Sequence, residues 1–246
     1  MTGGGDCPGL NSVIRAIVKT AVNKYEFEVI GFKDGYLGLV SNRFMKLGPN
    51  DVSGLLDKGG TILGTTNSYD PFNVLTDQDG EKIEKDMSDR IVDTLKMHDI
   101  DCLITIGGIN TITAAYKLSK KGIQIISVPK TIENDVPGTD QSFGFLTAVD
   151  TATQALDKLH STAESHHRIM ILEVTGRRAG WVALESGIAG GADIILIPEI
   201  PYDINSIARS VLARKNGGKN FSIICVADGC RPVGAAHVNK DSSSAD

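Results

Sequence analysis

The sequence predicts a mixed α/β protein with mostly parallel sheets that helices cover on both faces. Its 246 residues, 41% of them apolar and 22% charged, suffice for one large domain or two small ones and exclude a disordered or coiled-coil chain. Short β-branched runs alternate with amphipathic stretches, which is typical of strands joined by crossover helices. The apolar character of the runs CLITI and IQIISV is continuous, which favours strands buried on both faces.

The individual elements follow from the same patterns. Apolar residues recur at helical spacing between Leu10 and Val22, which predicts a helix over residues 9–24. Further helices are expected near residues 86–97, 111–120, 145–163, 179–189 and 203–214. Strands are expected at residues 27–32, 102–106, 123–128, 169–174, 194–197 and 221–227. Ligands of such sheets bind beyond the carboxyl ends of the strands, so the loops after the strands should carry the site.

Composition restricts the partners and the compartment. A net charge of −5 without a basic block argues against a nucleic-acid or anionic-membrane surface. The chain has no signal-peptide pattern and no apolar run long enough to span a bilayer, so no contact with a membrane is expected. The four cysteines lack metal-type spacing, and Cys102 lies in an apolar run where a buried thiol fits. We expect a reduced, cytoplasmic setting.

Glycine is enriched, with 27 residues, and its first cluster precedes the first predicted helix in the segment TGGGDCPGLN at residues 2–11. Glycine lets the backbone approach a phosphate, and the free N–H groups at a helix start attract anions. The segment matches neither the P-loop nor the dinucleotide pattern, and tight packing of a strand on a helix explains it equally well. Only Met1 and Thr2 precede it, so the strand that should lead into this turn is expected to be missing.

Three further loops adjoin predicted strands. Gly107 and Gly108 follow one strand and open a helix. The segment PKTIENDVPGTD at residues 129–140 gathers a lysine, hydroxyls and carboxylates after another strand, although a capped turn is the alternative. The segment at residues 166–181 brackets a strand with arginines, which suit phosphate oxygens but also a solvated rim.

Together and in this order, these segments resemble the phosphofructokinase family. The matching pieces are TGGGDCPGLNSVIRA, FKDGYLGL at 32–39, GGTILGTTN at 59–67, PKTIENDVPGTDQSFGF at 129–145, SHHRIMILEVTGRRAGWVAL at 165–184, AGGADIILIPE at 189–199 and SIICVADG at 222–229. The resemblance implies phosphoryl transfer from ATP or pyrophosphate to fructose 6-phosphate, giving fructose 1,6-bisphosphate in glycolysis. It also implies Mg²⁺ as cofactor and a homo-oligomer, either a dimer or a tetramer.

For the fold, the resemblance implies two Rossmann-like three-layer units. We place the donor-phosphate unit at residues 1–134, the sugar-phosphate unit at residues 135–230 and a polar tail at residues 231–246. Compared with the family, both ends are expected to be truncated and the fold incomplete. A cleft is expected to bring together Gly4, Gly107, Asp135, Arg168 and Arg177.

The resemblance also assigns roles to single residues. The donor phosphates would contact Gly4, Gly5, Gly107, Gly108, Asn110 and Lys130. The catalytic groups would be Glu133 as base, Asp135 beside the metal, Thr131 and Arg177. The sugar phosphate would contact Thr175, Gly176, Asp228 and, from a neighbouring subunit, Arg168.

Several of these positions depart from the family pattern. Glu133 is one methylene longer than the usual Asp, Ile109 replaces a metal-side carboxylate, and Asp228 replaces a Glu. Two hypotheses follow: a 6-phosphofructokinase, or a catalytically impaired regulatory or binding subunit of that family. On the second hypothesis, restoring Asp at positions 133 and 109 should raise the rate. A nicotinamide-dependent oxidoreductase is excluded because the dinucleotide fingerprint is absent.

Overall fold

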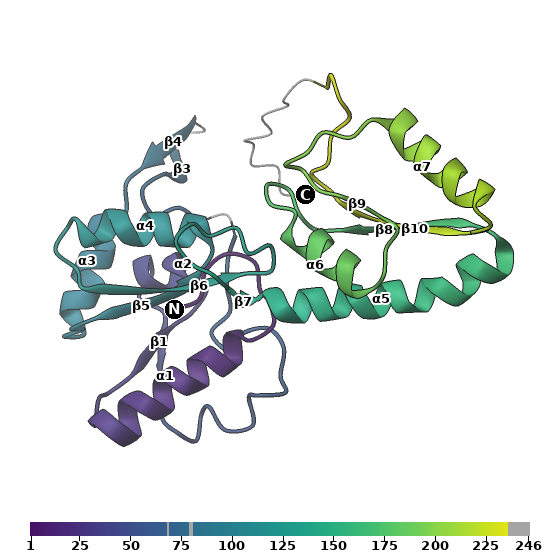
Figure 1. The fold of residues 1–246 in the computed structure, drawn as a ribbon. Coiled ribbons are helices and arrows are strands. Elements are labelled where there is room, and N and C mark those ends of the chain that lie inside the picture. Colours follow the sequence, from purple (N-terminus) through teal and green to yellow (C-terminus); the bar gives the residue numbers. More distant parts are fainter. Residues whose placement is uncertain (68, 79–80, 236–246) are drawn as a thin grey trace. The chain divides into compact units, whose positions relative to one another are not determined.

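The chain divides between Thr131 and Ile132 into two units (Figure 1). The structure is a computed structural model that describes residues 1–67, 69–78 and 81–235. The sequence places the division three residues later, after residue 134, and the functional label of each unit stays a prediction. Most of the predicted polar tail, from residue 236 on, lies outside the described residues.

The first unit alternates helices and short strands. In chain order its elements are α1 (Leu10–Tyr25), β1 (Ile30–Phe32), α2 (Tyr36–Val40), β2 (Phe44–Lys46), β3 (Val74–Gln78), β4 (Glu81–Lys85), α3 (Ser88–Met97), β5 (Leu103–Gly107), α4 (Ile109–Ser119) and β6 (Ile125–Thr131). Its core includes Phe32, Leu39, Ile91 and Leu118, each at most 2% exposed. Burying such side chains contributes about 1.5–3 kcal/mol each to the free energy of unfolding.

Strands β5 and β6 form the parallel sheet of this unit, with Leu103 opposite Ile125 and Gly107 opposite Pro129. The first three residues of the chain extend it, because Met1 and Gly3 exchange backbone hydrogen bonds with Ile104 and Ile106. Thr2 forms a parallel bridge to Ile106. The residues before the glycine cluster therefore act as the end of a strand, which corrects the expectation that nothing leads into the turn.

The predicted strand at residues 27–32 differs from expectation. It is reduced to β1, which pairs antiparallel with β2 in a register that sets Ile30 against Lys46. The connection through the five-residue helix α2 is short, whereas a parallel pairing needs a crossover of about a dozen residues or more. The antiparallel pair β3–β4 was also missed, although Asp79-Gly80 in the sequence is a hairpin signal.

The second unit contains a three-stranded parallel sheet in the order β8–β10–β9. Its elements are β7 (Phe143–Gly144), α5 (Phe145–His166), β8 (Ile169–Val174), α6 (Trp181–Ala189), β9 (Ile194–Leu196), α7 (Ile204–Asn216) and β10 (Ser222–Ala227). Helices α5 and α6 pack on one face of the sheet through Leu156 and Ala183, while α7 lies by the other face (Figure 1).

Burial on both faces, predicted from the runs CLITI and IQIISV, holds for β5 but is wrong for β6. In the second unit β10 is buried on both faces, whereas β8 is not. Ile126 of β6 is 57% exposed, and in β8 the side chains of Ile169 and Ile171 are exposed while Met170 packs in the core. Cys102 is exposed rather than buried, because it precedes β5 instead of belonging to it. An apolar run shows that a strand forms, but whether its second face is covered depends on which helix lies over it.

Candidate functional site

The glycine cluster forms a turn that ends at the start of α1. Gly4 and Gly9 have φ angles of +81° and +94°, which a residue with a side chain rarely adopts. The N-cap residue of α1 is Gly9, which has no side chain that could cap the first turn, and helix starts of this kind are common anion-binding positions. The turn is fastened by hydrogen bonds from Gly4 N to Thr66 O and from Thr65 Oγ1 to Gly4 O. The predicted residues Gly4 and Gly5 thus lie in a braced loop before a helix start.

Lys130, near the end of β6, joins this loop. Its side chain is 5% exposed, and its ammonium group donates a hydrogen bond to the carbonyl of Gly5. A Cβ added to Gly4 would lie 3.4 Å from Lys130 Nζ. The ammonium group of Lys130 therefore puts positive charge beside Gly4 and Gly5, although the whole chain is acidic. The structure therefore brings together three residues that the sequence assigns to the donor phosphates.

The second glycine pair lies against the same loop. Gly107 ends β5 and Gly108 precedes α4, whose first turn also lacks a side-chain cap. Thr111 of α4 fits between Gly3 and Gly107: an added Cβ would meet Thr111 Oγ1 at 2.7 Å and 2.5 Å respectively. Asn110 is exposed in the first turn of α4. Thr111 therefore packs the first turn of α4 against Gly3 and against the end of β5.

Replacing Gly107 by Ala is expected to lower the free energy of unfolding by about 1–3 kcal/mol, because the new methyl overlaps Thr111. Gly108→Ala is the matched control, since its Cβ would meet Lys130 O at an ordinary 3.5 Å. Urea unfolding of both variants measures the difference. Equal stability of the two variants would contradict the packing described.

Asn11 is a residue of this region whose role sequence reasoning missed. It is 3% exposed in the first turn of α1, and its amide nitrogen donates to the carbonyls of Lys58 and Gly59 at 3.0 and 3.2 Å. Its Oδ1 accepts a hydrogen bond from Ile62 N at 2.9 Å. Asn11 therefore ties the segment GGTILGTTN to the glycine turn. The available signal was a polar residue on the otherwise apolar face of the helix.

The loop after β6 carries the predicted acidic groups, Glu133 and Asp135, both half-buried. Asn134 between them has a φ of +52°, a conformation that Asn tolerates better than most residues. Its Oδ1 accepts from Ser142 N at 2.8 Å and its amide donates to Asp140 O at 3.1 Å. Asn134 thus closes the loop between itself and Ser142. Thr131, the last residue of β6, precedes this loop.

The loop after β8 presents two arginines from a fixed backbone. Gly176 N donates to Asp228 Oδ1 and Gly180 N donates to Glu199 Oε1, both at 2.8 Å. Both glycines are buried, whereas Arg177 and Arg178 between them are exposed. The carboxylate of Asp228, assigned to the sugar by resemblance, therefore also fastens this loop. The carboxylate of Glu199 holds the same loop through Gly180 N, a role that sequence reasoning did not predict.

The carboxylates of Asp228 and Glu199 also affect the pKa of the Cys230 thiol. Burial raises the pKa of the Cys230 thiol, and the charges of Glu199 and Asp228 raise it further. Glu199→Gln keeps an acceptor for Gly180 N but removes a charge, so we expect a lower Cys230 pKa and alkylation by iodoacetamide about twofold faster. Mass spectrometry of the Cys230 peptide measures the rate.

The exposed Glu185 on α6 supplies the control variant Glu185→Gln, and the exposed Cys102 supplies an internal reference for the alkylation rate. An unchanged Cys230 rate in Glu199→Gln would contradict the electrostatic account.

Arg168 and Arg177 do not meet within one chain. Arg168 immediately precedes β8, and Arg177 lies three residues beyond its end. The six-residue strand separates them by about 20 Å, at roughly 3.3 Å per residue. A single-chain cleft lined by both arginines is therefore wrong, because opposite ends of an extended strand cannot face the same ligand. Arg168 is exposed, as its assignment to a neighbouring subunit requires.

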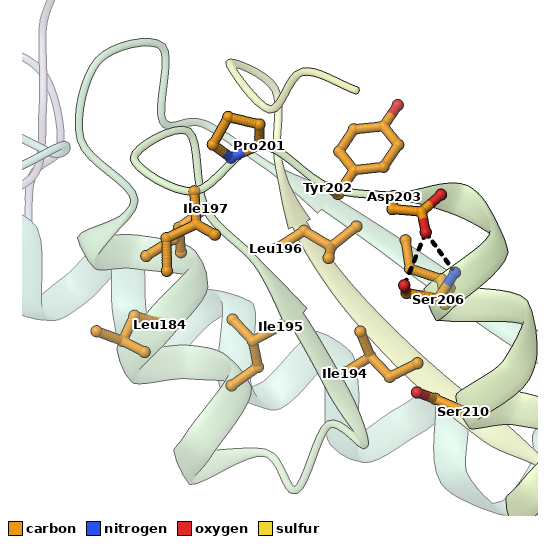
Figure 2. A pocket seen from close by; sticks show the side chains of 12 residues that line it. Leu184, Ile194, Ile195, Leu196, Ile197, Pro201, Tyr202, Asp203, Ser206 and Ser210 are labelled. Carbon is orange, nitrogen blue, oxygen red and sulfur yellow. Dashed lines mark hydrogen bonds between the residues drawn. The ribbon is translucent and has the colours of Figure 1, made fainter. Parts of the chain in front are cut away.

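A mostly apolar pocket of about 380 Å³ lies between β9 and α7 (Figure 2). Its lining includes Ile194, Leu196 and Ile207, and the carboxylate of Asp203 already caps α7 by accepting from Asn205 N and Ser206 N. No residue assigned to a phosphate or to the sugar lines it. Isoleucine side chains offer nothing to a charged ligand, so this pocket is separate from the candidate site.

No group of three or more His, Cys, Asp or Glu side chains that could hold a metal occurs among the residues that the structure describes. Mg²⁺ is commonly held by one or two carboxylates together with substrate phosphates. The half-buried Asp135 provides such a carboxylate, so the residues fit an ion that arrives with a phosphate ligand. In the same described part of the chain, none of the helices has the length and apolarity to cross a membrane.

Comparison with known proteins shows which family has this sequence and fold. A family model described as Phosphofructokinase matches residues 1–244. The chain is 57% identical over 233 residues to ATP-dependent 6-phosphofructokinase 2 of Clostridium perfringens, covering 94% of this chain and 64% of that protein. It is 49% identical over 231 residues to ATP-dependent 6-phosphofructokinase of Propionibacterium freudenreichii, covering 94% of this chain and 61% of that protein.

The chain thus spans less than two thirds of the length of these two relatives. Among solved structures, phosphofructokinase of Pichia pastoris in the T-state matches with a TM-score of 0.84 and 29% identity, covering 95% of this chain and 26% of that one. The mixed α/β fold with parallel sheets is therefore the phosphofructokinase fold, and the chain belongs to the phosphofructokinase family.

Proposed function

We propose that this chain transfers a phosphoryl group from ATP to fructose 6-phosphate, giving fructose 1,6-bisphosphate. The observation that carries the proposal is the buried ammonium of Lys130, which is hydrogen-bonded to the carbonyl of Gly5 in the glycine turn that leads to α1. Backbone N–H groups and a fixed cation suit the donor phosphates, and such transfer depends mainly on positioning and neutralisation of charge. The relatives' names favour ATP as the donor over pyrophosphate.

In this proposal Gly4, Gly5, Gly107, Gly108 and Asn110 contact the donor with their backbones or short side chains. Glu133 takes the proton from the sugar hydroxyl, and Arg177 neutralises charge on the transferred group. Asp135 holds Mg²⁺, which would neutralise the donor phosphates when bound. Thr131 helps to hold the phosphoryl group.

Thr175, Gly176 and Asp228 form the sugar side of the proposed site. Arg168 serves the site of a neighbouring subunit in a homodimer or homotetramer, and the cytoplasm is the proposed location. Sedimentation at micromolar concentration tests the assembly: a monomer that binds fructose 6-phosphate undiminished would contradict the role of Arg168.

The reaction itself is tested by a coupled assay for fructose 1,6-bisphosphate with Mg²⁺ and either ATP or pyrophosphate. We expect product with ATP, little with pyrophosphate and none after chelation of Mg²⁺. The same assay with fructose in place of fructose 6-phosphate is the control for the sugar phosphate. Tight binding of both substrates without any turnover would favour the binding-subunit hypothesis instead.

A further inference from the structure

A hydrogen bond joins two residues that lie 42 positions apart in the second unit. Thr175 Oγ1 donates to Glu133 Oε1 at 2.8 Å. We propose that Thr175 is a positioning residue that holds the carboxylate of Glu133 in place for proton abstraction. The proposal rests on the proposed function, in which Glu133 is the base. Thr175, which the proposed function places on the sugar side of the site, would thereby have a second role.

The backbone of Thr175 is fixed from both sides by one residue. Asp228 donates its N–H to Val174 O at 2.9 Å and accepts from Gly176 N at 2.8 Å through Oδ1. A Cβ on the neighbouring Gly229 would lie 2.4 Å from Arg177 O, so the two loops are in close contact. Thr175 is therefore held between two tethered residues, and its hydroxyl is presented from a rigid support.

Glu133 directly precedes Asn134, whose side chain closes the following loop through Asp140 and Ser142. The Glu side chain nevertheless retains several rotatable bonds, one more than Asp. Holding a flexible side chain in one rotamer costs conformational entropy, which a hydrogen bond to an ionised acceptor offsets. The hydroxyl of Thr175 supplies such a bond, so the longer side chain can have a defined carboxylate position.

A purely structural tie between the two loops is the alternative. Such a tie would affect stability and leave turnover unchanged, whereas a positioning role acts in the transition state and changes kcat. Thr175→Val removes the hydroxyl at nearly constant shape, and Thr175→Ser keeps it. Thr153→Val is the matched control, because Thr153 is a half-buried threonine of α5 whose hydroxyl donates to Val149 O.

We expect Thr175→Val to lower kcat about tenfold or more, with the KM value for ATP within twofold of the unmodified chain. Thr175→Ser should retain kcat within threefold, and Thr153→Val should leave it unchanged. An unaltered kcat in Thr175→Val, or equal losses in the Ser and Val variants, would overturn the proposal.

A second measurement separates this proposal from the proposed function. If the unmodified chain gives no product, phosphoryl transfer by this chain fails, and a double-mutant cycle of Thr175→Val and Glu133→Met in urea unfolding then tests the part of the proposal that remains, that the hydroxyl of Thr175 holds the carboxylate of Glu133. A coupling factor of about threefold or more in the unfolding equilibrium constant supports a bond that holds Glu133. Independent effects of the two substitutions would overturn it.

Discussion

Replacing Glu133 by Gln is expected to lower kcat for fructose 6-phosphate phosphorylation by about 10²–10⁴-fold, the usual contribution of a general base. Gln keeps the shape of the side chain and an acceptor for the Thr175 hydroxyl, but it cannot take a proton. The loss should therefore appear in kcat, while the KM values for both substrates change little. Steady-state kinetics in the coupled assay measure both. A Gln variant that retains a tenth of the rate would exclude Glu133 as the base.

The structure changes the result that we expect for Glu133→Asp. By family resemblance, Glu133→Asp should help to restore activity. In this chain, however, the carboxylate of Glu133 reaches Thr175 Oγ1 at 2.8 Å, and removing one methylene withdraws it by on the order of 1 Å. We therefore expect Glu133→Asp to lower kcat by up to about 10²-fold. An increase would show that the Thr175 bond holds the carboxylate away from its working position.

Replacing Arg177 by Met is expected to lower kcat by about 10²–10³-fold, comparable to the loss of one transition-state hydrogen-bond donor. Arg177 lies between Gly176 and Gly180, whose N–H groups are bound to Asp228 and Glu199. A guanidinium presented by a fixed loop needs little reorganisation when charge develops on the transferred group. Met retains much of the apolar stem and removes the charge.

Arg178→Met is the matched control for Arg177→Met, because Arg178 is exposed in the same loop and has no assigned role. We expect its kcat to stay within threefold of the unmodified chain. Melting temperatures of the two variants should agree closely, which separates lost catalysis from lost folding. Equal kinetic losses in both variants would show that the loop needs only net positive charge.

The sequence by itself determined the elements whose signals are local. The apolar spacing from Leu10 to Val22 predicted α1 nearly to the residue. Apolar residues at this spacing lie on one side of a helix, and that side packs against the core. The glycine clusters marked the turns before α1 and α4, and Lys130 was predicted in a loop directly after a strand, whereas the structure includes it near the end of β6. These features depend on neighbours a few positions apart, so a single sequence carries them.

Only the tertiary structure decided which distant groups meet. Asn11 binds the carbonyls of Lys58 and Gly59, and Thr175 binds Glu133, across separations of more than 40 residues. Local patterns do not encode such pairs, because they depend on which loops the packed sheets and helices bring side by side. The chemical groups of the candidate site could be identified from the sequence. Which of these groups contact and hold one another was decided by the long-range packing of the chain.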